Sequence, residues 1–343
     1  MRTSIPIAVF GALAALATPA LGQRVPFARS IDTLAPPILD VETEQGGIDV
    51  VAGEPGRVAI EGAVTVRVGL DVPADAAAVA KAVAEHPPIV QEGITIRLRP
   101  PSDDAARRAV TVSYRVTVPR GTRVVARSGS GATSIGGVSG EVSVTTGSAA
   151  IDLRDLGSDV KAASGSGAIT MDGVRGSVDV ETRSSAVKLR GLRGGLTARS
   201  GSGRIFAAGV PASAWRVSTS SSAIEVRLDP NARAALRASS GSGSVRVQGD
   251  GFTGTRAKAL VVGAIGGGGP DVHLESRSGS IHVTLAGAVA APRAAARQPT
   301  LSRRAALSAD PGGRRATPAR GWRGARPMPA SLPPTRASAD PRR

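Results

Sequence analysis

The imidazole and carboxylate side chains near residue 275 are the groups in this sequence best suited to bind a metal ion. Asp271, His273 and Glu275 alternate along one predicted strand, so they share a face, and His282 lies in the next predicted strand. Zinc takes such ligands, but this spacing matches no established zinc signature. We therefore keep these four residues as weak candidate ligands, and expect that the protein uses no metal and no other cofactor.

The many serines of the sequence do not form a recognisable catalytic site. Serine becomes a nucleophile when a neighbouring base accepts its proton, and no His or Lys recurs at a fixed distance from the repeated serines. The glycine-rich segment 263–269 lacks the Lys-Ser or Lys-Thr pair that follows a phosphate-binding loop. We predict no catalytic and no cofactor-binding residues, and expect that the protein is not an enzyme.

Aromatic residues make up only 2% of the sequence, and one of them is a candidate for surface contact. Phe206 stands between Ile205 and Ala207 in a predicted strand, so its ring faces away from the apolar side. Trp215 falls at an apolar position and is predicted to pack in the core. Phe206 is therefore the predicted surface contact.

A recurring sequence, Ser-Gly-Ser-Gly, defines the elements that carry these side chains. It occurs at 128–131, 164–167, 200–203 and 240–243, and a shortened copy follows at 278–280. The first three copies are 36 residues apart, and weaker copies lie midway between them, at 147–150 and 184–186. The structural period is therefore about 18 residues.

Apolar residues recur with the same period and predict the fold. One column consists of Thr133, Ile151, Ile169, Val187 and Ile205, and a second, nine residues later, of Val142, Val160, Val178 and Leu196. Apolar and polar residues alternate around both columns, as in half-buried strands, and glycines mark the corners. One coil cannot bury its small apolar side chains, but stacked coils can. We predict an all-β, β-helix-like β-solenoid with single-sheeted coils of about 18 residues.

Four regions are predicted along the chain. Residues 1–22 have the basic start, apolar run and small final residues of a signal peptide. Residues 23–126 form an N-terminal β region that opens the solenoid and contains one short helix near 75–86, which covers one end of the solenoid. Residues 127–286 form the β-solenoid repeats, and 287–343 form a disordered tail rich in Arg, Pro and Ala.

The spacing is less regular at both ends of the repeats. Four short strands, expected to form the opening coils, lie at 38–41, 48–51, 58–60 and 64–66. After Ile205, the coils continue through Ile224 and Val245 and are interrupted by an excursion at 251–269. They resume at Val272, and Leu285 is expected to be the last core residue.

The net charge of +16 is concentrated in the predicted tail. Residues 288–343 contain 12 Arg, 2 Asp and no Lys or Glu, and so carry +10 of that charge. No groove-fitting pattern accompanies the arginines, so the charge alone does not predict specific nucleic-acid binding. The sequence contains no cysteine, which excludes disulfides.

The sequence resembles the exported bacterial "putative adhesin" family, a family of domains of unknown function. The likeness is carried by the strand at 114–119 followed by Gly121, by the Ser-Gly-Ser-Gly corners, and by the unit Gly-Val-Arg-Gly-Ser-Val-Asp-Val at 173–180. It covers roughly residues 38–285. The resemblance implies stacked β-coils in a secreted or envelope-facing binding or structural protein, with no catalytic residues to carry over. The Arg-rich tail departs from the family pattern.

These features predict a non-catalytic, exported β-solenoid, periplasmic or extracellular, that acts in binding, adhesion or as a scaffold at the cell envelope. Its expected partner is an unknown envelope protein or polysaccharide, with no specific nucleic acid, no membrane-spanning segment and at most weak self-association. Two alternatives stay open. One is a carbohydrate-active or metal-dependent enzyme built on a β-helix, and the other is binding of anionic polymers through the Arg-rich tail.

Overall fold

The computed structural model describes residues 23–68 and 73–285, which form 25 strands and two helices. The predicted signal peptide at 1–22 and the predicted tail at 287–343 lie outside the described residues. The first elements are β1 (Arg24–Asp32), β2 (Ile38–Thr43), β3 (Ile48–Gly53), β4 (Arg57–Val66), α1 (Ala76–Glu85), β5 (Ile89–Glu92), β6 (Thr95–Leu98), α2 (Asp104–Ala109) and β7 (Val110–Pro119).

The regular repeats follow as strands of four to six residues. These strands are β8 (Arg123–Ser128), β9 (Thr133–Gly136), β10 (Val142–Thr146), β11 (Ile151–Leu156), β12 (Val160–Ser164), β13 (Ile169–Val174), β14 (Val178–Thr182), β15 (Val187–Leu192), β16 (Leu196–Ser200) and β17 (Ile205–Gly209). The less regular part contains β18 (Trp215–Thr219), β19 (Ile224–Leu228), β20 (Ala234–Ser240), β21 (Val245–Gln248), β22 (Phe252–Arg256), β23 (Leu260–Ile265), β24 (Asp271–Ser276) and β25 (Ile281–Leu285).

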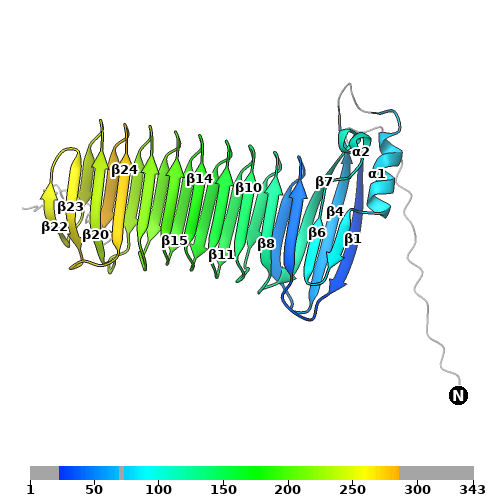
Figure 1. Ribbon diagram of the computed structural model, residues 1–343, viewed down its shortest axis with the longest axis horizontal. Helices are drawn as coiled ribbons and strands as arrows, with labels where there is room; N and C mark the ends of the chain where they lie inside the picture. Colours follow the sequence, from blue (N-terminus) through cyan, green and yellow to red (C-terminus); the bar gives the residue numbers. More distant parts are fainter. Residues whose placement is uncertain (1–22, 69–72, 286–343) are drawn as a thin grey trace, which may run out of the picture. The chain divides into compact units, whose positions relative to one another are not determined.

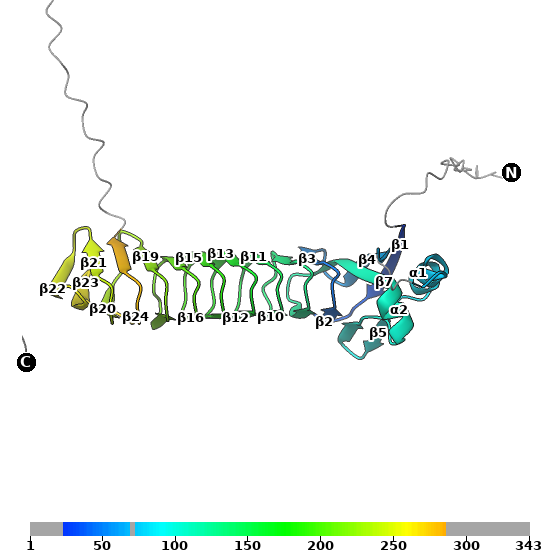
Figure 2. The ribbon, with the colours of Figure 1, turned by 90° about the horizontal axis from the view of Figure 1, so that it is seen from above.

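The strands form two sheets, which Figure 2 shows as two layers running along the stack of coils. Sheet A has 12 strands in the order β1-β4-β7-β3-β9-β11-β13-β15-β17-β19-β25-β21. Sheet B has 13 strands in the order β22-β23-β20-β24-β18-β16-β14-β12-β10-β8-β2-β6-β5. The predicted all-β solenoid is confirmed, but "single-sheeted" was wrong: each regular coil contributes one strand to each sheet, because its two apolar columns face each other across a shared core.

The predicted register is confirmed in the regular coils. In sheet A, Ile151 pairs in parallel with both Thr133 and Ile169, and the same column continues to Val187 and Ile205. In sheet B, Val160 lies between Val142 and Val178. These apolar side chains are almost completely buried between the two sheets. Stacking coils therefore buries small side chains that a single coil would leave exposed.

A column of buried hydroxyl groups runs along one corner of the solenoid, and the sequence analysis did not identify it. Ser164 shows its role: its Oγ accepts a hydrogen bond from the backbone N–H of Gly167 at 2.8 Å and contacts Thr146 Oγ1 at 3.2 Å. Parallel strand pairing places nine such residues in one ladder, in the order Thr43, Ser128, Thr146, Ser164, Thr182, Ser200, Thr219, Ser276 and Ser240.

Close contact between coils explains the glycine that ends each full Ser-Gly-Ser-Gly corner. A Cβ added at Gly203 would lie 1.6 Å from the carbonyl oxygen of Ser185, and one at Gly167 would lie 1.7 Å from that of Ala149. The intervening coils have Ala149 and Ser185 at the same corner position. Within the regular coils glycine occupies this corner in every second coil, at Gly131, Gly167 and Gly203, which matches the 36-residue spacing of the motif.

The order of the last coils differs from their order in the sequence. Strand β24 pairs with β18 on one side and with β20 on the other, and β25 lies between β19 and β21. The coil at 271–285, coloured orange in Figure 1, is thus inserted between the coils at 215–228 and 234–248. We call it the inserted coil. The antiparallel hairpin of β22 and β23 forms the excursion that allows the chain to return.

The N-terminal end is built differently from the predicted opening coils. Strands β2 and β3 do form a coil, but the segments at 58–60 and 64–66 belong to the single strand β4, which pairs antiparallel with β1 and β7. This corrects the expected stack of opening coils. Antiparallel pairing leaves β4 outside the parallel coil register.

The predicted helix near 75–86 is confirmed as α1, which lies at the N-terminal end of the stack in Figure 1. It buries Ala76, Ala80 and Ala84, spaced one turn apart, and contacts β1 and β4. A second short helix, α2, was not predicted. Neither helix is long and apolar enough to cross a membrane, a finding limited to the described residues.

Candidate functional site

The four weak candidate metal ligands do not lie together. Asp271, His273 and Glu275 all face outwards on β24 in sheet B, as their alternation predicted. His282 faces outwards from β25 in sheet A, on the other side of the solenoid. The described residues contain no group of three or more His, Cys, Asp or Glu side chains arranged to hold a metal ion.

The inserted coil gives the two histidines different neighbours. His273 lies in register between Arg216 and Arg237, whereas His282 lies between Glu225 and Arg246. The four candidate ligands therefore do not come together. Asp271, His273 and Glu275 share the outer face of sheet B, whereas His282 lies on the outer face of sheet A, with the core between them.

Trp215 is a core residue, as predicted. Its side chain is completely buried, and its indole N–H donates a 2.9 Å hydrogen bond to the carbonyl oxygen of Gly194. A buried indole with its polar hydrogen satisfied contributes to packing and is not accessible to a ligand.

Phe206 lies on the outer face of sheet A, as the alternation predicted, and it is half-buried there. The guanidinium groups of Arg190 on β15 and Arg227 on β19 lie 5.9 and 5.3 Å from the centre of its ring. Since β15 and β19 are the two neighbours of β17, one arginine comes from each side. Phe206 and Ala208 face outwards and Ala207 faces inwards. Ala208 lies in register with Arg227, so the outward residue next to Phe206 on β17 has a short side chain.

The charges around Phe206 are distributed unevenly. On the β19 side, Arg227 donates hydrogen bonds of 2.8 and 3.1 Å to the Glu225 carboxylate. On the β15 side, Lys188 and Arg190 form no ion pair or side-chain hydrogen bond with any described residue. We name Lys188, Arg190, Phe206, Ala208, Glu225 and Arg227 together the Phe206 surface.

The chemistry of the Phe206 surface is that of a contact site for planar or ring-shaped groups bearing negative charge. An aromatic ring offers an apolar face for stacking, and cations over such a ring are attracted to its π electrons. Arginine and lysine donate charge-assisted hydrogen bonds to carboxylate and phosphate oxygens. Sequence analysis found Phe206 but missed the arginines. The 18-residue period could have indicated Arg190, because Arg190 lies one period before Ala208, the next outward residue after Phe206.

A second candidate surface is an open groove near the N-terminal end of sheet A, with a volume of about 1140 Å³. Asp49, Glu61, Arg115 and Asp152 line it, among other residues. Asp49 is engaged by Arg115 at 3.0 Å, and Asp152 by Arg154 at 2.7 Å. Because two of its three carboxylates, Asp49 and Asp152, are already paired, we regard the Phe206 surface as the better candidate.

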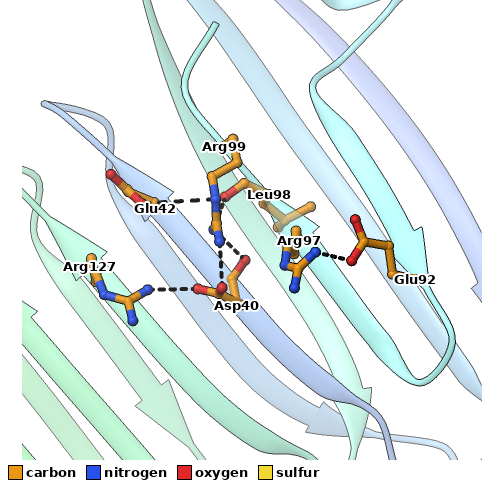
Figure 3. A network of polar contacts seen from close by, with 7 residues as sticks. All are labelled: Asp40, Glu42, Glu92, Arg97, Leu98, Arg99 and Arg127. Atoms are coloured by element: carbon orange, nitrogen blue, oxygen red, sulfur yellow. Dashed lines mark hydrogen bonds and ion pairs between the residues drawn. The ribbon is translucent and has the colours of Figure 1, made fainter. Parts of the chain in front are cut away.

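An ion-pair network on sheet B, shown in Figure 3, has a structural role. Asp40 on β2 contacts Arg99, which follows β6, and accepts a 2.9 Å hydrogen bond from Arg127 on β8. Burial on its own would raise the pKa of Asp40, but the hydrogen bonds and charges of the two arginines hold that pKa below its ordinary value. The network joins three neighbouring strands at the start of the solenoid.

The fold defines this protein as a β-solenoid of two mainly parallel sheets. Residues 107–284 match the family model described as Toastrack DUF4097, and the chain belongs to this family. The family resemblance expected from the Ser-Gly-Ser-Gly corners and the strand at 114–119 is thereby confirmed.

The solved structures that match this chain include two distant ones of named proteins. One is titled a "putative cell adhesion protein" from Clostridium sporogenes ATCC 15579, with 10% identity and a TM-score of 0.26, and the match covers 76% of this chain and 100% of that chain. The other is a "putative adhesin" from Bacteroides fragilis NCTC 9343, with 9% identity and a TM-score of 0.38, covering 76% of this chain and 97% of that chain. No curated protein matches the sequence.

Proposed function

We propose that this protein is an exported, non-catalytic β-solenoid that binds a component of the cell envelope, and that the Phe206 surface makes the contact. The observation that carries the proposal is the half-buried Phe206 ring on the outer face of a solenoid, flanked by arginines from both neighbouring strands. The inward columns repeat from coil to coil, whereas the outward residues differ. A binding function therefore belongs to particular coils on a common scaffold.

Capture from an envelope extract tests the binding function. The mature chain, residues 23–343, is immobilised as the natural sequence and as the Phe206→Ala variant. We expect saturable capture of an envelope component by the natural chain and a clear loss with Phe206→Ala. Phe252→Ala is a matched control, because Phe252 is also half-buried and also has an arginine, Arg256, 4.7 Å from its ring centre. Equal losses in both variants would contradict the role of Phe206.

A chain truncated after residue 286 separates this proposal from binding through the Arg-rich tail. If the Phe206 surface makes the contact, the truncated chain should retain capture that is sensitive to Phe206→Ala. Loss of all capture on truncation, with no effect of Phe206→Ala in the full chain, would favour the tail.

Export is tested by the mass of the protein purified from its own cells. The proposal expects a chain that begins at Gln23, recovered from the periplasm or the medium. Recovery of a chain that retains residues 1–22 from the cell interior would contradict export.

A further inference from the structure

We propose that the ligand of the Phe206 surface is an acidic polysaccharide, with a sugar ring stacked on Phe206 and the carboxylate of that sugar held by Lys188 and Arg190. This inference rests on the proposed function and adds the chemical class of the ligand. It follows from three features of sheet A: the half-buried Phe206 ring, the cations beside it that form no ion pair with a described residue, and the distribution of charge along the sheet.

The ring of Phe206 provides the apolar part of the site. Among the described residues on the outer face of sheet A from β9 to β25, it is the single Phe, Tyr or Trp side chain. The axial C–H groups of a sugar form an apolar face that packs on an aromatic ring, while the hydroxyl groups remain at the edge. Arg190 and Arg227 lie over this ring at 5.9 and 5.3 Å, so a stacked sugar takes the place of one guanidinium group, and Arg190, which forms no ion pair with a described residue, is the one free to move.

Lys188 and Arg190 provide the charged part of the site. Lys188 pairs in register with Phe206 on the adjacent strand, and adjacent strands are about 4.8 Å apart. A carboxylate attached to a sugar stacked on Phe206 therefore lies within hydrogen-bonding range of the β15 side chains. On the opposite side Arg227 already neutralises Glu225. Asp172 on β13 lies in register with Arg190 but forms no ion pair with it, so Lys188 and Arg190 still outnumber this carboxylate on the β15 side. A neutral sugar would make no use of this positive charge.

The charge along sheet A indicates where an extended ligand continues. From β15 to β21, outward-facing Lys188, Arg190, Arg227 and Arg246 outnumber the single carboxylate Glu225. On β11 and β13, outward-facing Asp152 and Asp172 outnumber Arg154. An acidic chain is therefore attracted over β15 to β21 and repelled over β11 and β13.

A single aromatic platform favours a polysaccharide over a single-stranded nucleic acid. Proteins that bind single strands stack successive bases on several aromatic side chains along a basic groove. The outer face of sheet A offers one Phe, Tyr or Trp ring among the described residues of β9 to β25, and the His282 imidazole lies two strands from it, so the face stacks one unit of a polymer and must hold the others by polar contacts.

Calorimetric titration of the mature chain, residues 23–343, with a tetramer of galacturonic acid tests the inference. A neutral galactose tetramer is the matched probe, and an oligothymidine of similar charge tests nucleic acid. We expect the acidic tetramer to bind more tightly than the neutral one, and Arg190→Gln to weaken only the acidic probe, by about tenfold, because a charge-assisted hydrogen bond is lost. Phe206→Ala should weaken both sugars.

Arg175→Gln is the control, because Arg175 is another exposed arginine without an ion pair among the described residues and lies outside the Phe206 surface. Unchanged circular dichroism and melting temperature should accompany each variant. Equal effects of Arg190→Gln and Arg175→Gln would overturn the assignment of the carboxylate to Arg190. Tighter binding of the oligothymidine than of the acidic tetramer would overturn the polysaccharide class.

The outcomes distinguish this inference from the proposed function. If Phe206→Ala abolishes capture from the envelope extract but the acidic tetramer does not bind, the proposed function stands and the polysaccharide assignment fails. If Phe206→Ala leaves both capture and tetramer binding unchanged, both fail.

Discussion

Thr133 has a buried hydroxyl group without a hydrogen-bond partner. It occupies a column that is otherwise Ile or Val, it is 1% exposed, and its Oγ1 makes no hydrogen bond. A buried hydroxyl that lost its water contacts without gaining others destabilises the folded state. The sequence analysis placed Thr133 in an otherwise apolar column, and the structure shows that its hydroxyl group is buried there without a partner.

Thr133→Val should therefore stabilise the protein. We expect the free energy of unfolding in urea to rise by about 1 kcal/mol, because valine has nearly the same shape and no hydroxyl to satisfy. Thr146→Val is the matched control, since Thr146 Oγ1 donates a 2.9 Å hydrogen bond to the carbonyl oxygen of Ala149. The same change there should destabilise. Destabilisation by Thr133→Val would show that its hydroxyl has a partner.

Gly203 cannot carry a side chain without moving the neighbouring coil. Its added Cβ would meet the Ser185 carbonyl oxygen at 1.6 Å, and the backbone of a stacked coil has little room to shift. We expect Gly203→Ala to lower the free energy of unfolding by about 2 kcal/mol or more, measured in urea. Ser185→Ala is the control, because that corner already holds a Cβ. A loss no larger than that of the control would mean that the corner can open.

At the scale of the elements, the Asp40 network joins β2, β6 and β8 through side chains. Parallel strand pairing already connects these strands, so the ion pairs add to backbone hydrogen bonds. Its importance lies in its position, where the regular coils meet the differently built N-terminal end. Most other ion pairs of the described residues join exposed side chains, and such pairs contribute little.

The lowered pKa of Asp40 predicts how this contribution depends on pH. The carboxyl has a lower pKa when folded than its ordinary value of 3.8, so its stabilising effect is complete well above that value and is lost as the pH falls through the lowered folded pKa. At pH 7, Asp40→Asn should reduce the free energy of unfolding by about 1 kcal/mol, and the difference should shrink below about pH 4.

Urea titrations of both proteins between about pH 2 and pH 7 measure this difference. Asp32→Asn provides the control, because Asp32 pairs with Arg57 at 3.2 Å on a highly exposed part of β1 and should change stability little at any pH. A difference between the natural chain and Asp40→Asn that stays constant down to about pH 2 would contradict the assignment.

At the scale of the whole solenoid, the inserted coil determines which residues become neighbours. It separates the coils at 215–228 and 234–248 and hydrogen-bonds to both. Both histidines of the last coils therefore face residues that the sequence order would not bring to them. The inserted coil also contributes to the core, since Leu274 and Ile281 are completely buried.

Paired cysteines test this arrangement, because the sequence has none of its own. Glu275 lies in register between Ser218 and Ser239, all on the outer face of sheet B. We expect disulfides in the double variants Ser218→Cys/Glu275→Cys and Ser239→Cys/Glu275→Cys, because adjacent strands bring Cα atoms within the range that a disulfide spans. Mass spectrometry under non-reducing conditions detects each bond.

The double variant Ser218→Cys/Ser239→Cys should not form a disulfide within one chain, since a strand lies between the two positions. Coils stacked in sequence order would give the opposite result for this variant and for the first pair. The three variants together therefore distinguish the two topologies.

The regular coils could be predicted in detail from particular residues. Ile151, Ile169 and Val187 define the register because apolar residues at a fixed period can be buried together in only one alignment of the coils. The outward position of Phe206 followed from the same alternation. Its contacts with Arg190 and Arg227 did not, because they depend on side-chain conformations and on β19 lying beside β17.

The sequence by itself determined the coil length, the buried columns, the helix at α1 and the corner glycines. These features depend on residues close in the chain, and on a pattern that repeats. Only the tertiary structure decided that the coils form two sheets, that β4 runs antiparallel and that the inserted coil lies between two earlier ones. The backbone hydrogen bonds of parallel strands are nearly the same for every coil, so they do not specify which coil is the neighbour. That choice depends on packing over the whole core.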